Sequence, residues 1–326
     1  MKASASMKQQ TLAGLEKYAK KTRRAQFLSE MDRVVPWAEL CALIEPHYPK
    51  GSPEGGRPPV PLERMLRIYF LQQWFNLSDP AVEDALYDST AMREFVGIDL
   101  GREAAPDETT VCKFRKLLVK QRLGKALLKG VNEHLRRQGI KLSNGTIVDA
   151  TIISAPSSTK NGDGQRDPEM GHTVKGKEYF FGMKAHVGVD SRHKLIHTVQ
   201  VSPANWADCE ALPHLLRGTE TKVWGDQAYH GQTEAIRAVA PGAQDCTNRR
   251  SRYRGGERID HVTRAKNRNK SRVRAKVEHT IGVIKRIFGF RKVRYRGLEK
   301  NRHRLEVTAA LTNLYLMRRM LLRAAG

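Results

Sequence analysis

The residues Gly145–Ala150, with the sequence GTIVDA, decide the fold because they form an apolar run that leads into an acid. A run of four to eight residues rich in Ile, Val and Thr is typical of a buried β-strand. We therefore predict a strand over residues 146–154, with Asp149 at the end of its apolar run. A second run, Lys222–Trp224, leads into Asp226 in the same way. These two aspartates are predicted to hold short carboxylates at strand ends, at one edge of a sheet.

Strand and helix patterns alternate around these two runs. Residues 183–190 and 195–201 predict a hairpin, since four residues separate them. Two helices and a further short strand are predicted at 208–216, 233–240 and 244–247. The order strand, strand, strand, helix, strand, helix, strand, helix is the ribonuclease-H-like α/β arrangement, a mixed sheet flanked by helices. In that arrangement the strands of Asp149 and Asp226 are neighbours.

The third acid, Glu278, lies in a segment with helical periodicity. Apolar residues recur there at intervals of three and four and form one stripe, which consists of Val273, Val277, Ile281, Ile284 and Phe288. Glu278 borders this stripe, Arg274 lies one turn before it and Lys285 two turns after, so the three share nearly one face. The simpler alternative is a surface acid paired with Arg274 at helical spacing. The two strand aspartates favour a metal ligand instead.

The charge of the chain points to a polyanionic partner. It has 326 residues and a formal net charge of +24, and residues 249–304 contain 21 Lys and Arg against four acids. Such a balance is typical of proteins that bind nucleic acid, although charge alone names no activity. No apolar run is long enough to span a membrane, and residues 1–8 lack the apolar centre of a secretory signal. The four cysteines lie far apart, which predicts reduced thiols and no zinc site.

The first part of the chain is predicted to be helical. We divide it into a helical N-terminal domain, residues 1–140, which would bind DNA ends, and a ribonuclease-H-like domain with a basic C-terminal region, residues 141–326. Asp107 opens a basic helix, and several short helices with one basic member suit a module of helix-turn-helix character. The alternative is a plain helical cap on the second domain. Residues 155–177, rich in Ser, Gly, Asp and Lys, are predicted to form a long loop.

Three carboxylates in a cationic protein suggest metal chemistry on phosphates. Mg²⁺ and Mn²⁺ prefer oxygen ligands, and two such ions about 4 Å apart can activate an attacking oxygen and stabilise a leaving one. We therefore predict that Asp149, Asp226 and Glu278 hold two Mg²⁺ ions, for which Mn²⁺ can substitute.

Four other polar residues near these acids receive structural interpretations. Asp190 is predicted to lie in a turn, Asp208 to cap a helix, His186 to lie in the sheet and His279 on a helix surface.

Several stretches together resemble one family. They are VDAT at 148–151, YFFGMKAH at 179–186, WGDQAY at 224–229 and FGFRKVRYRGL at 288–298, with Glu278 between Arg274 and Lys285. Their order and spacing over residues 30–320 are similar to DDE transposases of bacterial insertion sequences, in particular the IS-five family. The segment PDETT at 106–110 resembles the N-terminal domain of that group. The related signature usually has a Tyr three residues before the Arg, and Ser271 stands there.

The resemblance implies a ribonuclease-H-like core, two Mg²⁺ ions and double-stranded DNA with inverted-repeat ends as substrate. It also implies a homo-oligomer on the DNA, in the bacterial cytoplasm at the nucleoid and not at a membrane. The cations expected to bind DNA are Arg274, Lys285, Arg272, Lys276, Arg286 and Lys184. The segments 155–177 and 249–270 are candidate DNA clamps. Two alternatives stay open: a metal-dependent nuclease without strand transfer, and an inactive DNA-binding regulator derived from a transposase.

Overall fold

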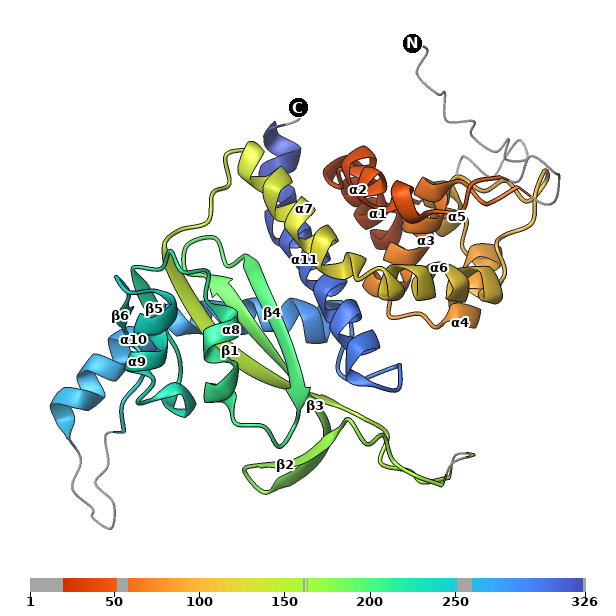
Figure 1. The fold of residues 1–326 in the computed structure, drawn as a ribbon. Helices are drawn as coiled ribbons and strands as arrows, with labels where there is room; N and C mark the ends of the chain where they lie inside the picture. Colours follow the sequence, from red (N-terminus) through yellow and green to blue (C-terminus); the bar gives the residue numbers. More distant parts are fainter. Residues whose placement is uncertain (1–19, 52–57, 161, 163, 251–259, 325–326) are drawn as a thin grey trace. The chain divides into compact units, whose positions relative to one another are not determined.

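The computed structural model describes residues 20–51, 58–160, 162, 164–250 and 260–324 (Figure 1). They form two compact units. The first contains the residues up to Gln121 together with those from Met317 onward, and the second is Arg122–Leu316. None of the described helices is long and apolar enough to cross a membrane.

The first unit is helical, as predicted for this part of the chain. Side chains of Thr22, Ser78 and Asp107 cap three of its helices by accepting a hydrogen bond from a first-turn backbone N–H. The helix α3 is buried on nearly all sides and forms the centre of this unit. The helices are α1 (Arg23–Val34), α2 (Trp37–Ile44), η2 (Glu45–His47), α3 (Leu62–Trp74), α4 (Asp79–Asp88), α5 (Thr90–Val96) and α6 (Glu108–Lys120).

The second unit is built on one mixed sheet, which confirms the predicted fold class. Its strands are β1 (Gly145–Ser154), β2 (Gly171–Lys175), β3 (Glu178–Asp190), β4 (Ile196–Pro203), β5 (Lys222–Trp224) and β6 (Gln244–Asp245). The strand order is β2-β3-β1-β5-β6, with β4 also paired to β3. The strand β1 runs antiparallel to β3 and parallel to β5. The predicted neighbourhood of the Asp149 and Asp226 strands is therefore correct.

Helices flank the sheet of this unit (Figure 1). They are α7 (Leu123–Arg137), η3 (Asp208–Ala211), α8 (Leu212–Leu215), η4 (Gln227–Tyr229), α9 (Thr233–Val239), α10 (His261–Gly282), the π-helical turn η5 (Val283–Ile287) and α11 (Leu298–Ala324). A core cluster in which Val148 and Val223 meet Leu212, Tyr229 and Ile236 packs β1 and β5 against α8, η4 and α9. Burial of this apolar surface fixes the strands that carry the candidate site.

Two features of this unit differ from the sequence prediction. The predicted loop 155–177 contains the strand β2, which pairs with the extended start of β3. The helix α7 also belongs to the sheet unit, since Asn132 donates to the Ile196 carbonyl and accepts from Asn313. The compact units thus divide at Gln121 and not at residue 140. A DNA-end-binding role for the N-terminal part stays a prediction.

Candidate active site

Asp149 lies in the middle of β1 and not at its end, which corrects the sequence prediction. The apolar run ends at Val148, but antiparallel pairing with β3 continues to Ser154, so the backbone hydrogen bonds extend the strand beyond it. The Asp149 carboxylate accepts a hydrogen bond from the backbone N–H of Ala150 at 2.9 Å. The backbone of Asp149 is held by pairing with Val187 of β3.

Asp226 lies where the chain leaves β5, as predicted. Its side chain caps the short helix η4 by accepting from the backbone N–H of Ala228 at 2.9 Å. The preceding residue, Gly225, packs closely on Tyr229, where a Cβ atom would lie 3.0 Å from ring atoms. A larger residue would push this turn away from the sheet, so Gly225 helps to hold Asp226 at the strand edge.

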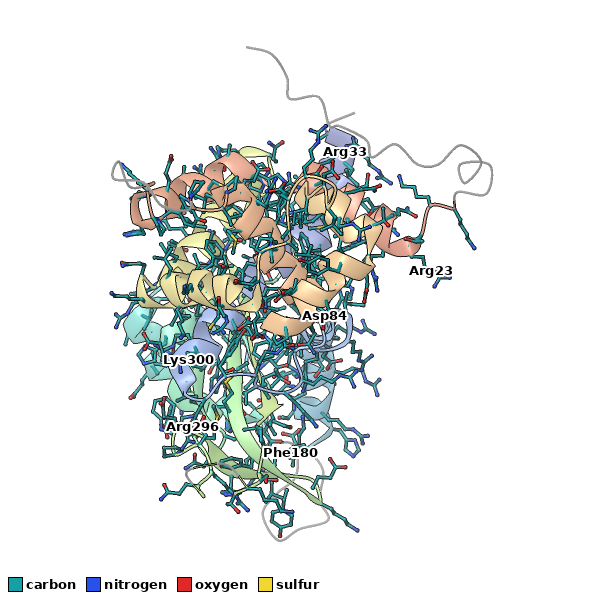
Figure 2. The ribbon with its side chains drawn as sticks, turned by 90° about the vertical axis from the view of Figure 1, so that its right-hand side faces the viewer. Arg23, Arg33, Asp84, Phe180, Arg296 and Lys300 are labelled. Atoms are coloured by element: carbon teal, nitrogen blue, oxygen red, sulfur yellow. The ribbon has the colours of Figure 1, made fainter. Side chains whose placement is uncertain are left out.

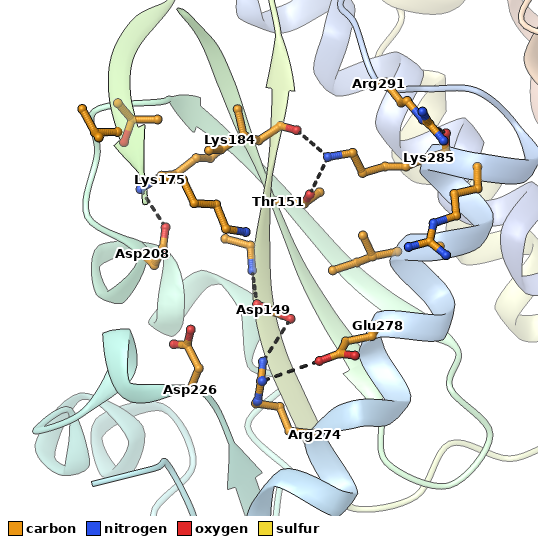
Figure 3. A pocket seen from close by; sticks show the side chains of 17 residues that line it. Asp149, Thr151, Lys175, Lys184, Asp208, Asp226, Arg274, Glu278, Lys285 and Arg291 are labelled. Atoms are coloured by element: carbon orange, nitrogen blue, oxygen red, sulfur yellow. Dashed lines mark hydrogen bonds and ion pairs between the residues drawn. The ribbon is translucent and has the colours of Figure 1, made fainter. Parts of the chain in front are cut away.

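Glu278 projects from α10, and Arg274 lies between it and Asp149 (Figure 3). The guanidinium is 3.6 Å from a carboxylate oxygen of Glu278 and 3.6 Å from one of Asp149. The side chain of Glu278 is 63% exposed, whereas that of Asp149 is 15% exposed. The helical ion pair expected for Glu278 is thus present, and it also connects the helix to β1.

All three acids line one pocket of about 890 Å³ (Figure 3). A fourth acid, Asp208, lines it as well. The cations in its wall are Lys175, Lys184, Arg274, Lys285, Arg286 and Arg291. This combination of carboxylates and a surplus of cations suits a phosphate-containing substrate whose charge the wall can balance.

Burial controls the ionisation of Asp149. Loss of hydration raises the pKa of its carboxyl to about 6, and the negative charges of Asp226 and Asp208 act in the same direction. The hydrogen bond from Ala150 and the charge of Arg274 oppose this rise in pKa. A second cation at this carboxylate would therefore be favourable.

Asp208 is the site residue that the sequence reasoning missed. It was predicted to cap a helix, but Ala207 occupies the N-cap position of η3 and Asp208 pairs instead with Lys184 at 2.9 Å. Lys184 also donates to the carbonyl of Trp206 at 2.5 Å, which holds its ammonium beside η3. One feature of the sequence could have indicated it: Asp208 follows shortly after the strand β4, just as Asp226 follows β5.

The predicted DNA-binding cations occupy different environments. The Lys285 ammonium donates to the Thr151 hydroxyl at 3.1 Å and to the Ile152 carbonyl at 2.9 Å, so it is anchored on β1. Its pKa is lowered by burial and by the nearby charges of Lys175 and Arg291. Lys276 donates to the Ser191 carbonyl at 2.6 Å and does not line the pocket.

Arg272 is exposed on α10 and Arg286 is exposed on η5, and of these two only Arg286 lines the pocket. Of the two candidate clamps, part of 249–270 falls outside the described residues, and α10 begins within it at His261.

The remaining polar predictions are confirmed. His186 is buried in the sheet and bonded to Ser202 at 2.8 Å, and burial lowers its pKa to about 4. Asp190 accepts from the backbone N–H groups of Arg192 and His193 in the β3–β4 turn. His279 is exposed on α10. Ser271, at the position where a Tyr was expected, accepts from the Asn248 amide at 3.1 Å.

The donor chemistry of the pocket fits a divalent hard cation. Asp149, Asp226 and Glu278 offer carboxylate oxygens, which Mg²⁺ and Mn²⁺ prefer. Among the described residues, no three His, Cys, Asp or Glu side chains already form a metal-binding group. Arg274 lies between Asp149 and Glu278 and pairs with both carboxylates.

Residues 141–314 match the family described as Transposase DDE domain. The chain belongs to the DDE transposases. Residues 16–117 match a second family, described as a transposase domain, which covers much of the helical unit. No solved structure matches the chain. Membership confirms the ribonuclease-H-like fold expected for the second unit, and a transposase of this family is a nucleic-acid-cleaving enzyme that generally uses divalent metals.

Proposed function

We propose that this transposase binds the ends of a bacterial insertion sequence of the IS-five type and cuts and joins DNA strands at Asp149, Asp226 and Glu278. The observation that carries the proposal is the meeting of these acids, from β1, the end of β5 and α10, in one cationic pocket. Double-stranded DNA is the substrate, and the helical N-terminal part recognises the element ends. Synapsis of two ends requires a homo-oligomer, which acts on the nucleoid in the cytoplasm.

The three carboxylates would hold two Mg²⁺ ions, which when bound activate the attacking oxygen and stabilise the leaving oxygen of a phosphodiester. Asp149 and Asp226 accept backbone hydrogen bonds that fix their carboxylates, so little reorganisation would be needed for them to hold these ions. Water attacks the phosphorus at each element end, the P–O3′ bond breaks, and the products are a 3′-hydroxyl on the element and a 5′-phosphate on the flank. That hydroxyl then attacks a target phosphorus in line, forms the new phosphodiester and expels the target strand's 3′-oxygen as a hydroxyl.

The cations of the pocket position the DNA backbone and balance its charge. Arg286 is exposed and can contact a phosphate directly, while Lys285 is held on β1 and places a fixed positive charge beside Asp149's strand. Arg274 can exchange its carboxylate partners for a phosphate when cations bind the acids. Such contacts orient the duplex without reading its sequence.

Cleavage of a supercoiled plasmid that carries the coding region with its native flanks tests the proposal. We compare wild type with Glu278→Gln, each with Mg²⁺ and with EDTA, and use Glu234→Gln as a control because Glu234 is exposed on α9 and does not line the pocket. We expect Mg²⁺-dependent cuts at discrete flanking positions for wild type and control, and none for Glu278→Gln.

End binding, measured by gel mobility shift, should be equal in the three proteins. Binding without cuts by wild type would instead support a DNA-binding regulator. Cuts without joined products would support a nuclease, and lost binding with intact cleavage would contradict the role of Glu278.

A further inference from the structure

The β2–β3 hairpin presents apolar side chains to solvent where burial would be expected. Tyr179 is 86% exposed and Val174 is 55% exposed. The two residues are cross-strand partners, so their side chains lie on one face of the hairpin. An exposed aromatic and β-branched pair of this kind is costly in water and marks a contact surface.

The same face continues as a row of rings and cations. His172 is the partner of Phe181, with ring centroids 4.8 Å apart, and the Arg166 guanidinium lies 5.6 Å from the Phe181 ring centre. Arg166 is anchored by donating to the Ser157 carbonyl at 2.8 Å. We call Arg166, His172, Val174, Tyr179 and Phe181 the hairpin platform. Rings interleaved with cations are typical of surfaces on which nucleobases stack.

The hairpin platform adjoins the candidate active site. Val174 of the platform lines the pocket that contains the three acids, as do its neighbours Thr173 and Lys175, whose side chains lie on the other face of β2. The turn is tight, with Lys175 paired to Glu178 and Gly176 at a φ of 67°, as a two-residue hairpin with Gly in its first position requires. The tip therefore has a fixed direction, and in Figure 2 the labelled Phe180 marks this hairpin at the end of the sheet.

The charge around the turn of the β2–β3 hairpin favours a polyanion over a protein as the binding partner. Lys175 and Lys177 are exposed there, Arg166 adds a third cation, and Glu178 is an exposed acid between them. We propose that the hairpin platform stacks an unpaired nucleobase of the DNA strand that enters the active-site pocket, with Tyr179 as the principal stacking residue. This inference rests on the proposed function, because it needs DNA in that pocket.

Two fluorescein-labelled single strands of equal length separate base stacking from phosphate binding. One is an oligothymidine of about 16 nucleotides, and the other has the same phosphates but abasic sugars. Fluorescence anisotropy in EDTA, which prevents cleavage, gives the affinity of wild type, Tyr179→Ala and Tyr179→Phe. Glu234→Gln is the control, since Glu234 is exposed on α9 and belongs neither to the pocket lining nor to the hairpin platform.

We expect wild type to bind the thymidine strand more tightly than the abasic strand. Tyr179→Ala should lose about tenfold in affinity for the thymidine strand and nothing for the abasic one. Tyr179→Phe, which keeps the ring, and Glu234→Gln should behave as wild type. Because Tyr179 is so exposed, thermal unfolding should be unchanged in all variants.

Other results would overturn the inference. Equal affinity of wild type for the two strands contradicts stacking and leaves the proposed function intact. A loss in Tyr179→Ala of self-association, measured by sedimentation, with unchanged DNA affinity assigns the platform to a second copy of the chain. Failure of wild type to bind either single strand contradicts this inference alone, because the proposed function concerns double-stranded element ends and is tested separately by the gel mobility shift and plasmid cleavage.

Discussion

The sheet side and the helix side of the pocket are built differently. On the sheet side, Asp149 is largely buried and Asp226 caps η4, and each accepts a backbone hydrogen bond. On the helix side, Glu278 is 63% exposed and is held by an ion pair with Arg274 at helical spacing, a contact worth a few tenths of a kcal/mol. Of the three carboxylates proposed to hold metal, the sheet thus fixes two, whereas the helix supplies one that is exposed and held only by an ion pair.

We therefore expect the sheet side to position the substrate and the helix side to balance the charge of the pocket. Fixed carboxylates reduce the reorganisation needed when a phosphate binds. An exposed carboxylate with a cation beside it is partly balanced in charge before any ion binds. Arg274, which contacts both sides, is the residue through which they are coupled.

Replacement of Asp149, on the sheet side of the pocket, should have the largest effect on the cleavage rate and should also change the stability of the fold. Asp149→Asn is expected to lower cleavage by about 10³-fold, because it removes a fixed ligand. It should also stabilise the fold by about 1 kcal/mol at pH 8, since the folded pKa is raised and the charged form destabilises the protein above pH 6. The gain should vanish below the unfolded pKa, near pH 4. Plasmid cleavage and urea unfolding at both pH values measure these effects.

The exposed Glu278 provides the comparison for this stability effect. Glu278→Gln should change the free energy of unfolding by less than about 0.5 kcal/mol at either pH, because surface ion pairs contribute little. Equal stability changes in the two variants would show that the sheet side is not more strongly desolvated than the helix side.

The fall of the cleavage rate at low pH, the acid limb of its pH profile, tests whether Arg274 couples the sheet side and the helix side of the pocket. At low Mg²⁺, the rate should fall about tenfold for each pH unit below 6, because protonated Asp149 cannot bind a cation. More Mg²⁺ should move this limb to lower pH. Arg274→Gln should move it to higher pH, since the guanidinium lowers the pKa of Asp149. A limb that Arg274→Gln leaves in place would mean that the two sides titrate independently.

The sheet side could be predicted further from the sequence than the helix side. Apolar runs before Asp149 and Asp226 identify strands locally, and the order of elements makes those strands neighbours. The extent of β1 was predicted to Ser154, but Asp149 was placed at a strand end because its apolar run stops there, whereas the pairing with β3, which is not local in sequence, puts it in mid-strand. The strand β2 was hidden for the same reason: its residues are polar, and only the partner strand makes them extended.

Side-chain partners were the least predictable part of the site. Basic residues such as Lys184 and Lys276 suggested DNA contacts from charge alone, but their ammonium groups bond to Asp208 and to the Ser191 carbonyl. Such pairs join residues far apart in the chain, so no spacing rule reveals them. The helical pair of Arg274 and Glu278 was predictable because its geometry is local.

Two further variants compare a paired cation of the sheet side with an exposed cation of the helix side, and neither is expected to abolish cleavage. Lys184→Met should destabilise the fold by about 2 kcal/mol, because Asp208 and the Trp206 carbonyl lose a charged donor at a largely buried position. Arg286→Ala should leave stability unchanged and lower the slope of log affinity against log salt by about 1, since it removes one phosphate contact. Thermal unfolding and salt titration of DNA binding measure these quantities.

Adding Asp208→Asn to Lys184→Met should recover part of the lost stability, because the unpaired charge is removed as well. If Lys184→Met instead kept full stability and reduced the salt slope, Lys184 would leave Asp208 to contact DNA, and the sheet side would be no more firmly held than the helix side.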